Sequence, residues 1–194
     1  TEIGETAVCN LGSVNLKSHI RDADGKLFLD RDRLASTIGT ALRVLDNVID
    51  LNFYPTEEAR NSNLQHRPVG LGMMATHDLL NALDIQYDSD EAVKFIDELT
   101  EFFSYNAIFA SSKLAKERGS YKTYSGSLWD QGILPIDTYN RLMEYRGSSV
   151  TAKTSKSLDW QLLRDHITRY GMRNSNTMAI APTATIGYIN GVSL

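Results

Sequence analysis

The chain has 194 residues and a formal net charge of −4, with 42% hydrophobic and 23% charged residues. This composition is typical of one soluble globular domain and excludes disordered and fibrous classes. It also argues against direct nucleic-acid binding, which usually needs a basic face. No apolar run reaches the ~20 residues that cross a bilayer and no signal peptide is evident, so we expect no membrane association and a cytoplasmic location.

The first third of the sequence predicts a short strand followed by helices. Residues 5–16 mix β-branched residues with glycine and asparagine, which favours a short strand and then a turn. Residues 21–26 predict a loop. Residues 30–51 place apolar side chains three or four positions apart and predict an amphipathic helix. Thr56 then offers an N-cap in front of two glutamates and predicts a short helix.

The middle of the sequence is dominated by one long helical pattern. Residues 67–85 predict an extended entry and then a helix. Residues 88–119 predict the longest helix, with Ser89 or Asp90 as its N-cap and Gly119 as its C-terminal stop. A helix of this length is expected to cross a whole face of the domain.

Three further segments follow in the C-terminal third. Residues 136–147 predict a short helix. Residues 148–157 contain few apolar side chains and predict a mobile loop. Residues 158–174 predict an amphipathic helix that is capped by Ser157 and closed by Gly171.

The stretch from Gly70 to Ala75, "GLGMMA", matches the G-x-G-x-x-A pattern of dinucleotide-binding sites. That pattern needs a buried strand before the first glycine, and residues 63–69 make a poor strand. We therefore interpret these glycines as allowing close backbone packing at the start of a helix. A nicotinamide-dependent dehydrogenase is an alternative that rests on this motif alone.

Cys9 is the single cysteine of the chain, so the chain contains no internal disulfide and a reducing compartment is expected. Two interpretations remain open from the residues alone. A lone cysteine in a strand is most often a small buried apolar side chain. A redox role would need a partner thiol that this chain does not supply. No histidine pair has the spacing of metal ligands, and we expect no metal site.

The end of the sequence combines a strand, a proline and two hydroxyl side chains. Residues 177–182 predict a short buried strand, and residues 183–190 predict a turn that enters a helix. The first N–H groups of a helix have no intrahelical partners and attract anions, so a phosphate could bind between Thr183 and Thr185. Alternatively, Thr183 is only the N-cap of the helix.

Four stretches resemble, in the same order, the large catalytic subunit of ribonucleotide reductases, and most closely the class I type. They are residues 5–16, 45–74, 114–121 and 171–193. The resemblance implies an α/β fold: a helix-rich piece, with short strands, of the family's ten-stranded α/β barrel. The resemblance therefore assigns residues 1–194 to a single, partial barrel domain.

The resemblance also implies an activity and two sets of site residues. The family reduces the ribose 2′-hydroxyl of ribonucleotides: a thiyl radical abstracts the 3′ hydrogen, and a cysteine pair supplies two electrons. Cys9 in "TAVCN" resembles one member of that redox-active pair, with its partner outside this chain. The "PTATI" match implies that the phosphates of a ribonucleoside diphosphate are held by Pro182, Thr183, Ala184, Thr185 and Ile186.

The remaining implications concern partners and completeness. No cofactor is expected on this chain, because the family takes its radical from a dimetal small subunit or, alternatively, from adenosylcobalamin. ATP and dNTP effectors and thioredoxin or glutaredoxin are the other expected partners. The family's radical-site segment, effector loops and C-terminal tail have no match in residues 1–194, so we expect the chain alone to be inactive. A free-standing nucleotide-binding, phosphate-binding or interaction module without catalysis is the alternative.

Overall fold

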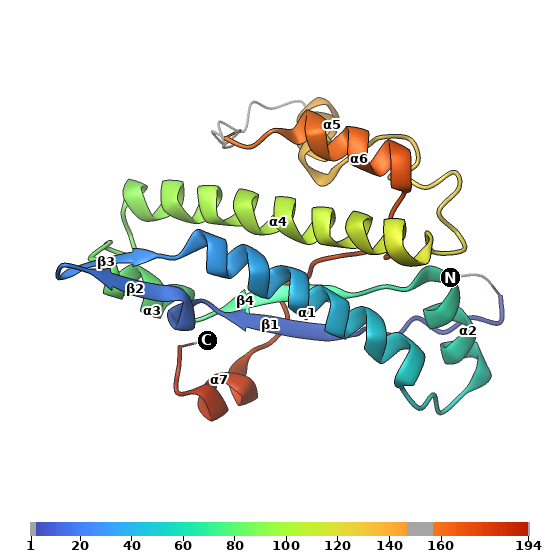
Figure 1. The fold of residues 1–194 in the computed structure, drawn as a ribbon, viewed down its shortest axis with the longest axis horizontal. Helices are drawn as coiled ribbons and strands as arrows, with labels where there is room; N and C mark the ends of the chain where they lie inside the picture. Colours follow the sequence, from blue (N-terminus) through green and yellow to red (C-terminus); the bar gives the residue numbers. More distant parts are fainter. Residues whose placement is uncertain (1–2, 147–156, 194) are drawn as a thin grey trace.

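The structure, a computed structural model, describes residues 3–146 and 157–193. Three of its helices are stacked in layers on one side of a short sheet (Figure 1). Helix α1 (Arg31–Leu51) packs on the sheet, α4 (Asp90–Arg118) packs on α1, and α6 (Trp160–Tyr170) packs on α4. This layering gives the molecule a helix-rich α/β architecture.

The sheet consists of two parallel strands and one bridging residue. Strands β1 (Leu11–Asn15) and β4 (Gly70–Met74) pair along their whole length. Parallel strands need a long crossover, and here α1 and α2 (Glu57–His66) lie within it. An isolated parallel bridge between Leu71 and Met178 extends the sheet on the far side of β4.

A β-hairpin occupies most of the region for which the sequence predicted a loop, residues 21–26. Strand β2 (Ile20–Ala23) pairs antiparallel with β3 (Lys26–Leu29). The two connecting residues, Asp24 and Gly25, have φ angles of 54° and 82°. An Asp-Gly pair with two positive φ values is the favoured two-residue hairpin turn, so the loop prediction is wrong here.

The strand predicted for residues 5–16 is shorter than expected. Regular β-structure begins only at Leu11, and the turn after it is a 3-10 helix, Leu16–His19. Cys9 therefore lies just outside the strand, and its side chain is exposed. The interpretation of Cys9 as a buried apolar side chain within a strand is thus wrong.

The periodicity predicted for α1 is confirmed by its burial. In α4 the predicted positions Leu99, Phe103, Ile108 and Leu114 are buried, but Val93 is 69% exposed. Asp30 caps α1 by accepting a hydrogen bond from the Arg33 N–H at 2.9 Å, and Ser89 caps α4 by accepting one from the Ala92 N–H at 3.1 Å. The apolar stripe predicted for α1 is buried: Leu34, Ile38, Leu42, Leu45 and Ile49. It packs against Leu99 and Phe103 of α4 in one hydrophobic core. Each such side chain contributes roughly 1.5–3 kcal/mol by leaving water.

The other helices begin near their predicted positions. Thr56 caps α2 through a 3.2 Å bond from the Ala59 N–H. After β4 the chain enters α3 (Thr76–Ala82), and α5 (Pro135–Arg146) precedes the gap in the description. The mobile loop predicted for residues 148–157 lies outside the described residues, except for Ser157.

The N-cap of α6 differs from the prediction. Asp159, not Ser157, accepts the capping hydrogen bond, from the Leu162 N–H at 3.0 Å. The Ser157 hydroxyl instead donates to the carboxylate of Glu101 on α4 at 2.8 Å. Gly171 ends the helix as predicted.

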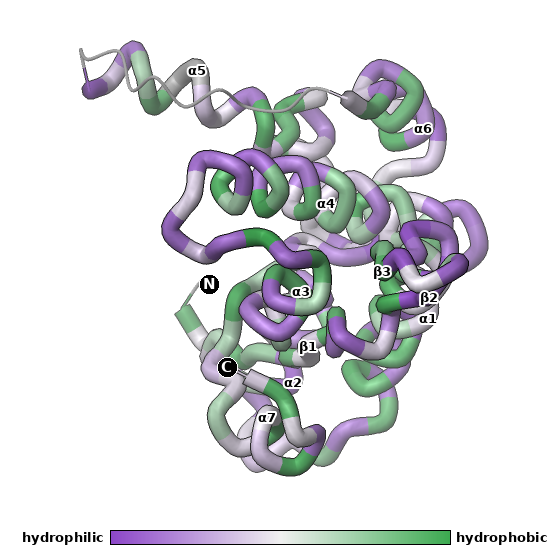
Figure 2. The backbone as a smooth tube through the Cα atoms, turned by 90° about the vertical axis from the view of Figure 1, so that its left-hand side faces the viewer, coloured by the Kyte–Doolittle hydropathy of each residue, from purple (hydrophilic) through white to green (hydrophobic). Residues whose placement is uncertain are grey.

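The strand predicted for residues 177–182 is reduced to the single bridge at Met178. Ile180 is 75% exposed and Pro182 is also exposed, so the segment leaves the sheet after Ala179. It then enters α7 (Ala184–Asn190), which lies on the opposite side of the sheet from α4 and α6 (Figures 1 and 2).

The glycines of "GLGMMA" do allow a close approach, but within a strand and not at a helix start. Gly70 and Gly72 belong to β4. A Cβ atom on Gly70 would lie 2.9 Å from the Cβ of Ala179, and one on Gly72 would overlap the Ala179 carbonyl oxygen. These two positions therefore let residues 177–179 pass directly alongside β4.

Candidate active site

A cavity of about 440 Å³ lies where three distant parts of the chain meet, the second part being α2 with the residues just after it. Its walls come from residues 7–11, from α2, from residues 68–70 and from residues 175–179. The polar side chains on its wall are those of Cys9, Asn10, Ser62, His66, Ser175 and Asn176. The predicted redox residue thus lies in a concave site beside the segment that leads to the predicted phosphate loop.

The segment that carries Cys9 is held against α2 on both sides of the thiol. On one side, the Thr6 N–H donates to the Glu58 carbonyl at 3.2 Å. On the other, buried Asn10 donates from Nδ2 to Asn63 Oδ1 and to the Pro68 carbonyl, each at 3.0 Å. These bonds fix the backbone around Cys9 although its side chain is exposed.

A histidine–carboxylate pair adds a third attachment of this segment. The Nε2 atom of His66 lies 2.9 Å from Oε2 of Glu5, whose side chain is only 8% exposed. The Nδ1 atom of His66 lies 2.7 Å from the Thr123 hydroxyl. Both ring nitrogens are engaged, so the imidazole has a defined orientation at the edge of the cavity.

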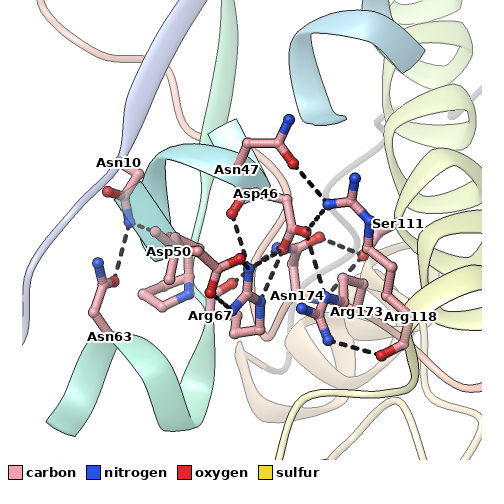
Figure 3. Close-up of polar contacts among 12 residues, drawn as sticks. Asn10, Asp46, Asn47, Asp50, Asn63, Arg67, Ser111, Arg118, Arg173 and Asn174 are labelled. Carbon is pink, nitrogen blue, oxygen red and sulfur yellow. Dashed lines mark hydrogen bonds and ion pairs between the residues drawn. The ribbon is translucent and has the colours of Figure 1, made fainter. Parts of the chain in front are cut away.

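Behind the cavity lies a buried charge network that sequence reasoning missed (Figure 3). Asp46 of α1 is completely buried. Its carboxylate accepts hydrogen bonds from Arg67 at 2.9 Å, from Arg118 at 2.9 Å and from Arg173 at 3.3 Å. Asn174 donates a further bond at 3.1 Å. Several guanidinium partners offset the desolvation cost of the buried carboxylate.

Arg67 connects this network to a second carboxylate. It donates two hydrogen bonds of 2.8 Å to Asp50. This bidentate contact holds the pKa of Asp50 below its ordinary value. Burial lowers the pKa of Arg67, but the carboxylates of Asp50 and Asp46 outweigh it, and the pKa is raised overall. The Arg67 guanidinium therefore stays charged in the interior.

The network also determines the path of the chain along the cavity wall. The Asn174 amide donates to the Arg67 carbonyl at 3.1 Å, and Ser111 of α4 donates to Asn174 at 2.9 Å. Shortly afterwards, the Val69 N–H donates to the Asn176 carbonyl at 3.1 Å. Residues 174–176 are thereby tied both to the charge network and to the entry of β4.

One signal in the sequence pointed to Asp46. It lies one position after Leu45 and three before Ile49, which places it on the buried stripe of α1. An acidic residue on an apolar stripe needs partners when buried. The partners themselves were not predictable, because Arg118 and Arg173 come from distant segments.

The predicted phosphate loop lies close in sequence to the cavity but not in its wall. The wall ends at Ala179, three residues before Pro182. Thr183 occupies the N-cap position of α7 but makes no side-chain capping bond. The interpretation of Thr183 as only a capping residue is therefore not supported by its contacts. Of the five loop residues, Thr183 is half-buried and the others are exposed.

The segment after α7 is tied back to α3. The Ser193 N–H donates to Asp78 at 2.6 Å, and the Ser193 hydroxyl accepts from the Asp78 N–H at 3.3 Å. The Ser193 backbone N–H lowers the pKa of the Asp78 carboxyl most, and the Ser193 side chain lowers it further. Both ends of α7 are thus connected to the sheet region.

Within residues 3–146 and 157–193, no group of three potential metal ligands comes together. In the same part of the chain, every helix is too short or too polar to cross a membrane.

Comparison with known proteins gives one family for the whole chain. The family model described as ribonucleotide reductase, barrel domain, matches residues 1–194. The subunit alpha of ribonucleoside-diphosphate reductase from Chlamydia pneumoniae is 58% identical over 190 residues, which are 97% of this chain and 18% of that protein. The Helicobacter pylori subunit alpha is 41% identical over 192 residues, 98% of this chain and 23% of that protein.

A fungal relative is similar over the same region. The ribonucleoside-diphosphate reductase large chain of Neurospora crassa is 38% identical over 187 residues, which cover 96% of this chain and 19% of that protein. The chain therefore spans about a fifth of the length of the curated relatives that it matches.

Proposed function

Because the chain belongs to the ribonucleotide reductase barrel-domain family, we propose that it forms part of the large subunit of a ribonucleoside-diphosphate reductase. The observation that carries this proposal is the match of the family over the entire chain, with Cys9 in a cavity beside a conformationally fixed segment. The reaction replaces the 2′-hydroxyl of a ribonucleoside diphosphate by hydrogen and releases water.

In this proposal Cys9 supplies one half of the electron pair. Two thiols become one disulfide and release two electrons and two protons, while the 2′ carbon exchanges its C–O bond for a C–H bond. The second thiol belongs to a part of the subunit outside this chain, since Cys9 is its single cysteine. The cavity wall and the exposure of Cys9 favour access of both a substrate and a second sulfur atom.

The loop Pro182–Ile186 is proposed to hold the substrate diphosphate. The support is its match to the family's "PTATI" segment and its position a few residues beyond the cavity wall. In this proposal, Thr183 and Thr185 act as hydroxyl donors, beside backbone N–H groups at the beginning of α7.

The partners follow from the family. Ribonucleotide reductase large subunits work with a small subunit that generates the radical. We propose that the protein containing this chain does the same, and that thioredoxin or glutaredoxin reduces its disulfide after each turnover. ATP and dNTP effectors would bind to parts of the large subunit outside these residues.

A chimeric enzyme tests the proposal directly. This chain replaces the matching 190 residues of the Chlamydia pneumoniae subunit, which is 58% identical to it. With its small subunit and a dithiol reductant, the chimera is expected to reduce ribonucleoside diphosphates, and its Cys9→Ser variant is expected to lose sustained turnover. A folded chimera without activity, or full turnover without Cys9, would overturn the proposal.

A further inference from the structure

Helix α1 carries apolar side chains over about half of its circumference. Its buried stripe faces the core that it shares with α4. Beside that stripe lie Ala41, Val44, Val48 and Leu51, which are three or four positions apart and therefore share one side of the helix. A helix that packs on one side only usually has an apolar stripe of about 100°. These four side chains thus form a second apolar face of α1.

The second apolar face is open in the part of the chain that the structure describes. Val44 is 53% exposed, Val48 is 37% exposed and Leu51 is 84% exposed, whereas no side chain of the buried stripe is more than 9% exposed. Ala41 is half-buried against the core and connects the second face to that stripe. A contiguous row of exposed apolar side chains, unlike scattered single ones, marks an interaction surface.

The second apolar face is also free of charge. The two other positions on this side of α1, residues 37 and 40, are threonines. The charged side chains in the same part of the helix are Arg43, Asp46 and Asp50, and each of them forms an ion pair away from this face. A charged partner would lose its water here without gaining a counter-ion. The partner that fits this face is therefore apolar.

The position of the second face relative to the sheet indicates what kind of element covers it. Leu45 lies between the two apolar faces, and both of its methyl carbons would be 3.6 Å from a Cβ atom on Gly12 of β1. On the other flank of the buried stripe, Asp46 accepts a hydrogen bond from Arg118 of α4. The second face therefore lies on the β1 side of α1 and points away from α4.

Strand β1 has one open edge on that side. In the described part of the chain it pairs with β4 alone. An open edge of a parallel sheet invites a further strand, and the faces of parallel sheets are covered by helices. A helix that accompanies a further strand beside β1 would lie next to α1, against its second apolar face.

We propose that the second apolar face of α1 is the docking surface for an apolar helix from the part of the large subunit outside residues 1–194. The inference rests on the proposed function, because it takes the chain to be a piece of that subunit. The chain spans about a fifth of the length of its curated relatives, so most of the subunit is available to supply the helix.

Cysteine labelling in the chimeric enzyme tests whether the face is covered. The variants are Val44→Cys and Leu51→Cys, with Ser36→Cys as the matched control, because Ser36 is exposed on the same helix outside this face. The folded large subunit is treated with N-ethylmaleimide, and peptide mass spectrometry follows each engineered thiol. Rates measured in urea correct for intrinsic reactivity.

The corrected rates of Val44→Cys and Leu51→Cys are expected to be about tenfold lower than that of Ser36→Cys, or lower still, because a docked helix withdraws both thiols from water. Equal corrected rates at the three positions in a folded subunit would overturn the inference. Protection that appears only after the small subunit is added, or only at high protein concentration, would also overturn it.

Photo-crosslinking identifies the element that covers the face. Benzoylphenylalanine is incorporated at Leu51, at the end of the face, and the chimera is irradiated and digested. The expected product joins this position to a Chlamydia-derived peptide of the same polypeptide, outside the replaced region. Products with the summed mass of two subunits, or no product at all, would contradict docking within one subunit.

These measurements are separate from ribonucleotide reduction. An active chimera whose second apolar face is labelled as fast as Ser36→Cys would remove the docking surface and leave the proposed function intact. A folded, inactive chimera whose second face is protected would count against the proposed function and leave the docking surface intact.

Discussion

Asp46 shows how single residues hold this fold together. Its carboxylate is completely buried, and it bonds to guanidiniums from the end of α2, the end of α4 and the segment after α6. Removing one partner of a buried ionic group leaves other charges without compensation. The same side chain that lies on an apolar stripe therefore organises three segments around the cavity.

The substitution Asp46→Asn is expected to lower the free energy of unfolding by about 3–5 kcal/mol, because three guanidiniums lose their common carboxylate. Urea denaturation followed by circular dichroism measures the change. Asp50→Asn is the matched control, because the Asp50 side chain is 49% exposed, and we expect a much smaller loss. Equal losses in the two variants would contradict the central role of Asp46.

The predicted phosphate loop gives a second test at single residues. Replacing Thr183 and Thr185 by valine in the chimeric enzyme is expected to weaken substrate binding by about 1–3 kcal/mol, since phosphate oxygens lose hydroxyl donors. Substrate affinity is measured from the concentration dependence of reduction. Stability should change little, because Thr183 makes no side-chain capping bond. Unchanged affinity with lowered stability would identify the threonines as structural.

At the scale of elements, one carboxylate of α4 adds polar contacts to the apolar packing that attaches α6 to α4. Glu101 accepts hydrogen bonds from Trp160 Nε1 at 2.9 Å, and from the Ser157 N–H and hydroxyl. Burial alone would raise its pKa, but these donors outweigh burial and lower it. The folded state thus favours the ionised form, and this contribution to stability is present at neutral pH.

The pH dependence of stability follows from the lowered pKa of Glu101. Glu101→Gln is expected to lose about 1–3 kcal/mol of unfolding free energy at pH 7. The difference in unfolding free energy between Glu101→Gln and the unmodified chain is expected to shrink in acid. It begins to shrink below the ordinary glutamate pKa of 4.5 and is lost as the pH falls through the lowered pKa of Glu101. Unfolding free energies from pH 3 to pH 7 measure it. A difference that grows in acid would contradict this assignment.

The close approach of β4 to residues 177–179 can be tested with two glycine substitutions that are expected to change stability in opposite directions. Gly72→Ala is expected to destabilise the fold, because the new methyl group would overlap the Ala179 carbonyl oxygen. Gly39→Ala lies in α1 with no neighbour within 4 Å of the new Cβ and is expected to stabilise by about 0.5–1 kcal/mol. Thermal unfolding of both variants measures the effect, and a tolerated Gly72→Ala would contradict the packing.

Helices and tight turns of this fold are predictable from local sequence, whereas strand pairing is not. The helices α1 and α4 were predictable because their buried positions repeat with the helical period, and their caps are local. The hairpin is likewise encoded locally, by Asp24 and Gly25 at its turn. The predicted strand at residues 177–182 is wrong because the segment leaves the sheet after Ala179, and only Met178 forms a bridge.

At the scale of the whole molecule, the candidate site is assembled from segments that are distant in the sequence, residues 7–11, 62–70 and 175–179. The redox role proposed for Cys9 comes from the family resemblance. The cavity around Cys9, and His66 beside it, were not predictable, because they depend on how α2 and residues 175–179 pack around β4. The family fold adds the rest of the barrel, of which this chain forms one piece.

The most direct measurement concerns the oxidation state of Cys9 after one turnover. The chimeric enzyme is given one equivalent of substrate without an external reductant, then quenched, alkylated and analysed by peptide mass spectrometry. The account predicts that Cys9 escapes alkylation and is recovered in a disulfide with a second cysteine of the subunit, in an amount equal to the deoxyribonucleotide formed. Recovery of alkylated Cys9 alongside a full equivalent of product would contradict it.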